Sequence, residues 1–246
     1  MKRKHPIAAL VIVAALLATV AVFFFTRRFD MADFSLASAQ QANKPLVMPE
    51  KGEPDFRFQQ FSVWDRQSMP VIARIDAPMG SESGAMTYNA QPFWSMNEAR
   101  GGHHTGDDLN GIGGMNTDLG DPVFAVADGV VVYSGEPSTG WGKILILGHR
   151  FADGRYFQSM YAHLHEAFPA LGALVGRGQK IARVGTAHGV YPAHLHYEIR
   201  CGNGADIGAG YAEQRLNRVS PAEFSAACRA ADDALEMSVT ALKLRE

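Results

Sequence analysis

The chain has 246 residues, of which 47% are hydrophobic and 20% are charged. This is an ordinary globular composition, and it excludes a mainly disordered or low-complexity protein. Residues 1–28 contain five basic residues and no acidic one, whereas the rest of the chain carries 18 basic and 25 acidic side chains, a net charge of −7. Because phosphate binding needs a basic surface, this acidic body argues against nucleic acid as a partner.

The first apolar segment predicts a membrane anchor. Ile7 to Phe25 is a run of 19 residues without a charge, flanked on both sides by basic residues. As a helix it spans about 29 Å, which matches a hydrocarbon core of about 30 Å. The alternative is a cleavable signal peptide, whose apolar region is usually only about 7–15 residues long. The stronger amino-side flank predicts that residues 1–6 are cytoplasmic, that residues 7–25 cross the inner membrane once, and that the body is extracytoplasmic.

The part of the chain beyond the anchor divides into three regions. Residues 26–55 are polar and show no sustained period, so they predict a flexible tether. Residues 56–219 predict a mainly β, antiparallel domain, because 22 of the 25 glycines lie between Gly101 and Gly210 and separate short apolar runs. We expect the aromatic residues of the 56–80 stretch to form a first core strand. The predicted strands are Val123–Tyr133, Lys143–Leu147, Tyr156–Tyr161, Lys180–Val184 and His194–Ile199.

Residues 220–246 predict a C-terminal amphipathic helix that packs on the domain. Ser220 is placed as the N-cap, Pro221 as the first helical residue, and Glu223 stands three residues after the cap. The only cysteines are Cys201 and Cys228. An oxidising compartment permits a disulfide between them, and two buried free thiols are the alternative.

Histidines and acids form two patterns that indicate metal chemistry. One is the stretch from His103 to Asp108, and the other is His194-Leu195-His196. In a strand, residues i and i+2 share a face, so His194 and His196 stand side by side. Two imidazoles and one carboxylate, with the fourth position left to water, make a catalytic zinc site of the open type. The spacing by itself does not choose between the pairs His103–Asp107 and His104–Asp108.

Taken together and in order, these motifs resemble the lysostaphin/LytM-type zinc metallopeptidases that cut peptidoglycan cross-bridge peptides. The resemblance runs from about Met79 to Phe224. The motifs that carry it are His104-Thr105-Gly106-Asp107-Asp108, Gly120-Asp121-Pro122-Val123, Ala127-Asp128-Gly129-Val130, Gly140-Trp141-Gly142, Tyr161-Ala162-His163-Leu164, Gly176-Arg177-Gly178-Gln179 and His194-Leu195-His196-Tyr197-Glu198. The fold that it implies is an open antiparallel sheet that carries a substrate groove walled by loops.

The resemblance also implies roles for individual residues. His104, Asp108 and His196 would bind one zinc ion, and His163 and His194 would be the catalytic histidines. His103, Asp107 and His165 are then interpreted as polar neighbours. His149 would satisfy a turn or line the groove edge, and His188 would belong to a groove loop. The stretch Thr186–Ala193 departs from the usual pattern of the family, which leaves the preferred cross-bridge open.

The expected activity is zinc-dependent hydrolysis of peptidoglycan peptide stems. Zinc would acidify a water and polarise the scissile carbonyl, and neutral His163 and His194 would handle the proton and the oxyanion. Two alternatives are a catalytically silent relative that activates a cell-wall amidase and a peptidase acting on secreted proteins. Silent relatives usually lack at least one ligand, whereas this chain keeps the whole set. The sequence is also compatible with a protein regulator, but it does not identify one.

Overall fold

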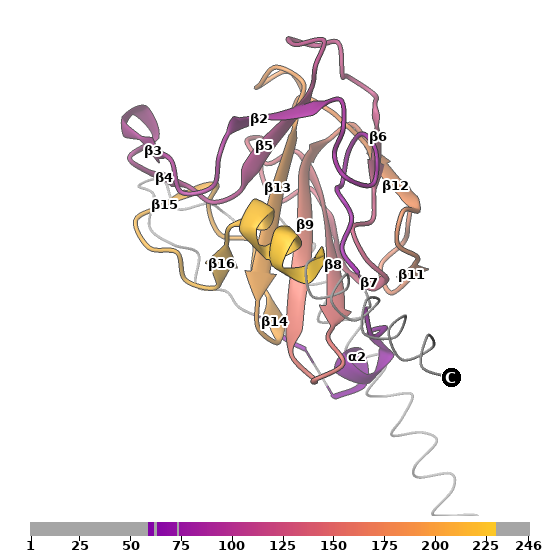
Figure 1. The fold of residues 1–246 in the computed structure, drawn as a ribbon. Coiled ribbons are helices and arrows are strands. Elements are labelled where there is room, and N and C mark those ends of the chain that lie inside the picture. The colour runs from indigo at the N-terminus through magenta and orange to yellow at the C-terminus, as the bar shows by residue number, and fades with distance from the viewer. Residues whose placement is uncertain (1–58, 62, 73, 230–246) are drawn as a thin grey trace, which may run out of the picture.

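The computed structural model describes residues 59–229, apart from residues 62 and 73, and antiparallel strands dominate it (Figure 1). The largest sheet has the strand order β11-β7-β8-β9-β13-β5-β2, with β16 also paired to β13. Its two end strands do not pair with each other, so the sheet is open, and the predicted mainly β, antiparallel fold is confirmed. Its strands are β2 (Thr87–Gln91), β5 (Asp107–Gly111), β7 (Gly129–Gly135), β8 (Lys143–Arg150), β9 (Tyr156–Leu164), β11 (Leu174–Val175), β13 (Leu195–Cys201) and β16 (Arg218–Val219).

Three smaller sheets complete the β structure of the described residues. Their strand orders are β10-β12-β6, β15-β4-β3 and β1-β14, and each pairing is antiparallel. The strands are β1 (Gln59–Gln60), β3 (Met96–Asn97), β4 (Gly102–His104), β6 (Pro122–Phe124), β10 (Glu166–Ala167), β12 (Lys180–Arg183), β14 (Gly204–Ala205) and β15 (Tyr211–Ala212).

The main sheet is buried on both faces because its central strands are apolar on both sides. On β8, Leu145 and Leu147 face a large core, whereas Ile144 and Ile146 face a second, smaller one. This alternation follows from the two-residue period of a strand. The smaller core also contains Trp141, whose ring contacts that of His196.

The predicted strand Val123–Tyr133 is wrong as a single element. It is two strands in two different sheets, β6 and β7, joined by residues 125–128, of which the first three are Ala125, Val126 and Ala127. These three residues are fully buried as the chain passes between the sheets. Residues 125–127 are therefore apolar because they are buried, not because they belong to one continuous strand.

The long core strand expected in residues 56–80 does not appear in the described part of this stretch. The described part of this stretch contains the two-residue strand β1 and the short helix α2 (Val63–Ser68). Phe61 is buried, but it packs with Met69 and Val130 in a small separate cluster rather than within the main sheet. Just after this helix, the Met69 backbone N–H donates to the carbonyl of Asp65.

The predicted start of the C-terminal helix agrees with the structure. Residues 221–229 are helical, and the Glu223 backbone N–H donates to Ser220 Oγ at 3.3 Å, as an N-cap requires. The helix packs on the domain through Phe224, whose ring centroid lies 5.1 Å from that of Phe157. Cys201 and Cys228 are free thiols in the structure.

The predicted anchor (7–25), the tether (26–55) and the end of the C-terminal helix (230–246) lie outside the described residues. Among the described residues, no helix has the length and apolar character needed to cross a membrane. The domain boundaries proposed from the sequence stay predictions.

A buried histidine on strand β8 predicts a loss of stability in acid. His149 is fully buried, and its Nδ1–H donates to the Asp128 carbonyl at 2.7 Å, so it satisfies a turn. Burial lowers the pKa of His149 from 6.5 to about 4. Between these values the unfolded chain binds a proton that the folded chain does not. The free energy of unfolding should therefore fall as the pH drops from 6.5 to 4, by about 3 kcal/mol in total from this group.

Urea unfolding at several pH values between 7 and 4 would measure this effect in a His149→Gln variant. In this variant the free energy of unfolding should fall less steeply between pH 6.5 and pH 4 than in the wild type. This difference is expected whatever the stability of the variant at pH 7. A His165→Gln variant is the matched control, because His165 is exposed. Equal acid slopes in wild type and the His149→Gln variant would contradict the prediction.

Candidate metal centre

Strand β13 carries the centre of the site because its residues alternate between the two faces of the sheet. Leu195, Tyr197 and Ile199 belong to the large core. His196 and Glu198 therefore point to the opposite face, where both are buried. The register pairs His196 with Asp108 of β5, so neighbouring strands bring these two residues together.

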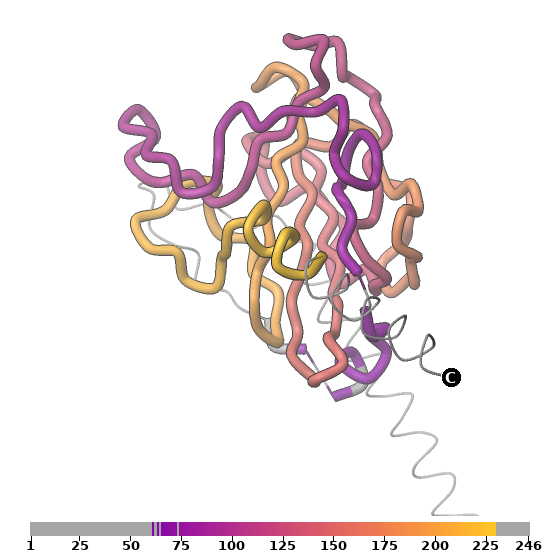
Figure 2. The backbone as a smooth tube through the Cα atoms, in the orientation of Figure 1, coloured from indigo at the N-terminus to yellow at the C-terminus, as the bar shows by residue number. Residues whose placement is uncertain are grey.

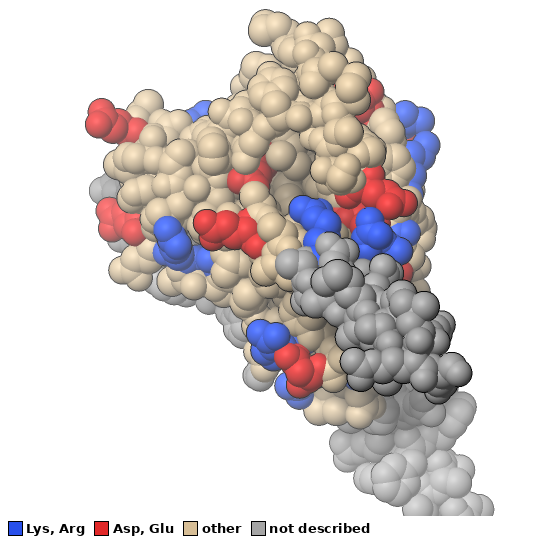
Figure 3. Space-filling view, viewed as in Figure 1, with Lys and Arg blue, Asp and Glu red and all other residues tan. Residues whose placement is uncertain are grey.

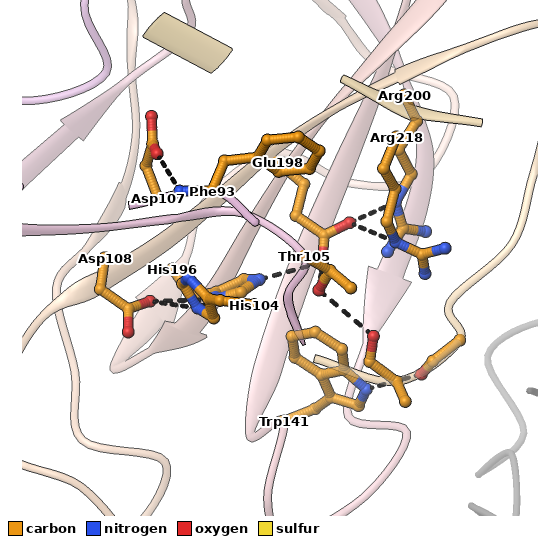
Figure 4. Close-up of polar contacts among 12 residues, drawn as sticks. Phe93, His104, Thr105, Asp107, Asp108, Trp141, His196, Glu198, Arg200 and Arg218 are labelled. Atoms are coloured by element: carbon orange, nitrogen blue, oxygen red, sulfur yellow. Dashed lines mark hydrogen bonds and ion pairs between the residues drawn. The ribbon is translucent and has the colours of Figure 1, made fainter. Parts of the chain in front are cut away.

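Three residues converge at this point (Figure 4). Asp108 Oδ1 lies 3.0 Å from His196 Nδ1 and 3.1 Å from His104 Nε2, and the two ring nitrogens are 3.0 Å apart. His104 comes from β4, in a different sheet. The side chains of the two histidines are 2% and 3% exposed and that of Asp108 is 15% exposed, so solvent reaches the cluster from the side of the carboxylate.

Glu198 fixes which nitrogen of His196 faces the cluster. Glu198 Oε1 lies 3.0 Å from His196 Nε2. A carboxylate only accepts hydrogen bonds, so Nε2 carries a proton towards Glu198, and Nδ1 is the nitrogen that would offer its lone pair to a metal ion held with Asp108 and His104. Two imidazole nitrogens and one carboxylate oxygen, with one ring oriented from behind by a carboxylate, are the donor set of a catalytic zinc site. The donors present therefore fit such an ion.

The Glu198 carboxylate is itself held in a buried polar network. Its oxygens accept from Thr105 Oγ1 at 2.7 Å, Arg200 Nε at 2.7 Å and Arg218 Nε at 3.1 Å (Figure 4). Burial alone would raise the pKa of Glu198, but the two guanidinium groups outweigh burial and hold the pKa well below its usual range. Glu198 is therefore ionised, and its negative charge is fully paired.

Electrostatics at the cluster favour a bound positive charge. Burial alone would raise the pKa of Asp108, but its hydrogen bonds with His104 and His196 hold the pKa well below its usual range. Burial alone would lower the pKa of His196, yet its hydrogen bonds to Asp108 and Glu198 raise it to about 9. The centre of the cluster thus favours a positive charge.

His163 reaches the cluster through an irregularity in its strand. The pairing of β8 with β9 shifts register next to it, and His163 has a left-handed φ of 60°. Such a bulge re-aims a side chain. The ring lies 4.8 Å from that of His194 and 5.6 Å from that of His196, measured between centroids. Burial, followed by the charges of His196 and His194, lowers the pKa of His163 well below 6.5, so it is neutral at pH 7.

His194 approaches the same cluster from just before β13. Its Nδ1–H donates to the Pro192 carbonyl at 2.8 Å, which leaves Nε2 at 3.7 Å from Asp108 Oδ1. Its side chain is 12% exposed, so it lies on the solvent side of the cluster with Asp108. The structure therefore brings together all five residues that the sequence singled out, and their chemical roles stay predictions.

The residues interpreted as neighbours lie elsewhere. The ring of His103 stacks on Trp94 at 4.6 Å, and Asp107 points away from Asp108 to accept from the Phe93 backbone N–H at 2.8 Å (Figure 4). His165 is exposed. The ambiguity between the two pairs four residues apart is thus resolved, because only His104 and Asp108 meet.

Gly106 is required where β4 leads into β5. A Cβ atom at this position would lie 2.5 Å from the Tyr197 carbonyl oxygen and 2.8 Å from Glu198 Cγ. Both distances are shorter than real Cβ contacts, so any side chain would push β13 and its histidine away from Asp108. The glycine of the His-x-Gly-x-Asp motif therefore serves close packing behind the cluster.

Two loops, residues 112–121 and 186–193, lie at one end of the molecule (Figure 2). Asn116 Oδ1, in the loop 112–121, accepts from the Ala193 backbone N–H at 2.7 Å and so joins this loop to the loop 186–193. Ile112, Met115 and Val190 in these loops are exposed. On the face shown in Figure 3, the uppermost part of the molecule carries no Lys, Arg, Asp or Glu. These exposed apolar side chains lie on the loops that are expected to wall the groove.

Sequence reasoning missed most of the network around Glu198. Arg200 could have been found, because it lies two residues after Glu198 and shares its face. Arg218 could not, because only the pairing of β16 with β13 brings it close. Tyr211, whose ring lies 5.4 Å from that of His104, likewise depends on the pairing of β15 with β4.

Comparison with known proteins decides the family. Residues 104–208 match the model of peptidase family M23. Lipoprotein NlpD of Yersinia enterocolitica is 37% identical over 81 residues, which are 33% of this chain and 78% of that protein. The chain belongs to peptidase family M23. The lysostaphin/LytM-type resemblance seen in the sequence is thereby confirmed.

Other curated proteins and solved structures are similar to part of the chain. Murein hydrolase activator NlpD of Escherichia coli is 37% identical over 33% of this chain and 20% of its own length. Peptidoglycan DD-endopeptidase ShyB of Vibrio cholerae is 34% identical over 34% of this chain and 18% of its own. The catalytic domain of lysostaphin from Staphylococcus simulans is 24% identical, with 56% of this chain and 89% of that domain covered and a TM-score of 0.40. The chain spans about a quarter or less of the length of several curated relatives that it matches.

Proposed function

We propose that this M23 protein is a zinc-dependent endopeptidase that hydrolyses the peptide cross-bridges of peptidoglycan. The observation that carries the proposal is the convergence of His104, Asp108 and His196, whose ligand atoms all lie within 4.8 Å of one another. His163 and His194 next to this cluster supply groups for proton transfer. Family membership and the name of the Vibrio relative support the class of substrate.

The three ligand atoms would hold one zinc ion, with Glu198 keeping His196 in the required tautomer. A zinc ion there supplies a Lewis acid and lowers the pKa of a bound water towards about 7. The chain itself contributes the proton acceptor and the orientation of the reacting groups.

His163 is the proposed proton acceptor. Its Nδ1–H donates to the Trp141 carbonyl at 3.1 Å, so Nε2 bears the lone pair, and burial keeps the ring neutral. A neutral ring with a free lone pair beside the ligands is suited to take the proton of the attacking water. His194, on the solvent side of the cluster, is the second proposed catalytic histidine. Because its Nδ1–H already donates to the Pro192 carbonyl, its Nε2 would donate to the carbonyl oxygen that becomes negative only when the ring carries a proton on both nitrogens.

A His163→Ala variant should lower kcat by roughly 10²–10⁴-fold, the usual contribution of a general base, with zinc content unchanged. Steady-state cleavage of a purified muropeptide dimer and metal analysis would measure both quantities. His165→Ala is the matched control, since this second histidine of the His163-Leu164-His165 sequence is exposed and should keep full activity. A His163→Ala variant that retains wild-type kcat would contradict the role.

Digestion of purified sacculi tests the proposed function directly. The full chain should release peptide fragments that mass spectrometry identifies as products of cross-bridge cleavage. Release should stop with a chelator and return when zinc is added. An unchanged digest in the presence of the chelator, or intact sacculi with zinc-loaded protein, would overturn the proposal.

An alternative function is supported by the name of one relative. The Escherichia coli NlpD is called a murein hydrolase activator, so this chain could instead bind and activate a separate cell-wall hydrolase. The complete ligand set favours the enzyme. Zinc analysis separates the two functions, since one tightly bound ion per chain is expected only of the enzyme.

We further propose that the protein works outside the cytoplasm and is linked to the inner membrane through residues 7–25. The relatives named as lipoproteins are consistent with a membrane-associated protein. Protease digestion of spheroplasts should degrade the domain while residues 1–6 stay protected. A domain protected until the cells are lysed would contradict this topology.

A further inference from the structure

Arg100 is an exposed cation held on a fixed backbone. It ends the short helix η1 (Glu98–Arg100) between β3 and β4. Its backbone N–H donates to Asn97 Oδ1 at 3.1 Å, and Gly101 closes the turn with a left-handed φ of 72°. The hairpin of β3 and β4 lies beside β15 (Figure 1), because Tyr211 pairs with His104. The position of the Arg100 backbone is therefore tied to that of a predicted zinc ligand.

The Arg100 guanidinium lies over two tyrosine rings that border the cluster. Its central carbon is 5.5 Å from the centroid of the Tyr191 ring and 5.8 Å from that of the Tyr211 ring. The Tyr191 ring in turn lies 4.7 Å from the ring of His163, and the Tyr211 ring lies 5.4 Å from that of His104. Arg100 is thus one aromatic ring away from the proposed base on one side and from a proposed ligand on the other.

The charge of Arg100 has no carboxylate partner among the described residues. Arg200 and Arg218, by contrast, both donate to Glu198 in the buried network. Tyrosine faces attract a guanidinium, but they leave its N–H groups free, and a guanidinium has five of them in a planar fork that matches a carboxylate. An exposed, pre-positioned and unmatched guanidinium beside a reaction centre is suited to bind an anion.

We propose that Arg100 is a specificity-determining residue that binds a free carboxylate of the substrate peptide. This inference rests on the proposed function and narrows its substrate to peptides with a carboxylate close to the scissile bond. Only one aromatic ring separates Arg100 from the histidines, and an extended peptide advances about 3.3 Å per residue. The carboxylate therefore belongs to a residue one or two positions from the bond that is cut.

The test compares one muropeptide dimer with its carboxylates free and the same dimer after its carboxylates have been converted to amides. Binding is measured by calorimetry on the full-length, zinc-loaded protein carrying His163→Ala, so that the peptide is not cut. The free acid should bind roughly 10–100-fold more tightly than the amide, the range of a charge-assisted hydrogen-bonded pair. Adding R100Q should remove this preference. R100K should retain only part of it, because lysine keeps the positive charge but lacks the planar fork of N–H donors.

R215Q is the matched control. Arg215 is also exposed and lies over aromatic rings, those of Phe93 and Trp94, but it does not lie over Tyr191 or Tyr211. It should leave the preference intact. Equal affinity for the two peptides, no binding of either, or a preference that survives R100Q would overturn the inference. Loss of the preference in R100Q supports it even if the wild-type protein cuts neither peptide, in which case the proposed function alone fails.

Discussion

An Asp108→Ala variant is expected to lose tight zinc binding and measurable peptide hydrolysis together. Asp108 Oδ1 is the atom that both cluster histidines contact, at 3.0 and 3.1 Å. Without it, His104 and His196 are the only donors left at the centre, and the carboxylate that balances the cation is gone. Removing a residue that only hydrogen-bonds to a metal ligand lowers the metal affinity by roughly 10–100-fold. Removing the ligand itself should therefore lower the zinc affinity by more than about 100-fold.

Competition with a chromophoric chelator would measure the zinc affinity, and cleavage of a muropeptide dimer would measure the activity. Asp107→Ala is the matched control: its carboxylate lies one residue away but accepts from the Phe93 backbone N–H, so zinc affinity should stay close to that of wild type. Circular dichroism should show that both variants are folded. A folded Asp108→Ala protein that still holds one zinc tightly would show that the centre is not a metal site.

The local pattern of the sequence predicted the parts of the fold that depend on neighbouring residues. The alternation of His194, Leu195 and His196 placed the histidines on one face and the leucine in the core, where Leu195 lies fully buried. The order Ser220-Pro221 predicted the start of the last helix for a similarly local reason, since the cap hydrogen bond joins residues three apart. Strand periodicity and helix capping act over two to four residues, so they can be read without a structure.

The same local reasoning failed where residues are buried without belonging to a strand. Ala125, Val126 and Ala127 are apolar and buried, yet they carry the chain from one sheet to another. A window of residues cannot distinguish a strand from a buried crossing, because both exclude water. The site shows a comparable limit: the proposed ligands were recognisable from their motifs, whereas Arg218 and the Tyr211 ring beside Arg100 reach the site only through pairings with distant strands.

A Glu198→Ala variant is expected to destabilise the protein by about 3–5 kcal/mol, the cost of breaking a buried ion pair by removing one partner. Glu198 is fully buried, and its loss leaves the guanidinium groups of Arg200 and Arg218 without their shared carboxylate. Urea unfolding would measure the change as a lower midpoint at constant slope. Glu166→Ala is the matched control, because the Arg183–Glu166 pair is 40% and 54% exposed with atoms 3.7 Å apart, and it should cost less than about 1 kcal/mol.

The milder Glu198→Gln variant separates the structural part of this effect from its effect on the metal. Glutamine keeps the shape and one acceptor for the arginines, but it no longer obliges His196 to carry its proton on Nε2. Zinc affinity should therefore fall by roughly 10–100-fold even where the fold survives. Equal stability of the Glu198→Ala and Glu166→Ala variants would contradict the buried network. Unchanged zinc affinity in Glu198→Gln would mean that the strand and its packing alone orient His196, and that the carboxylate serves the arginines only.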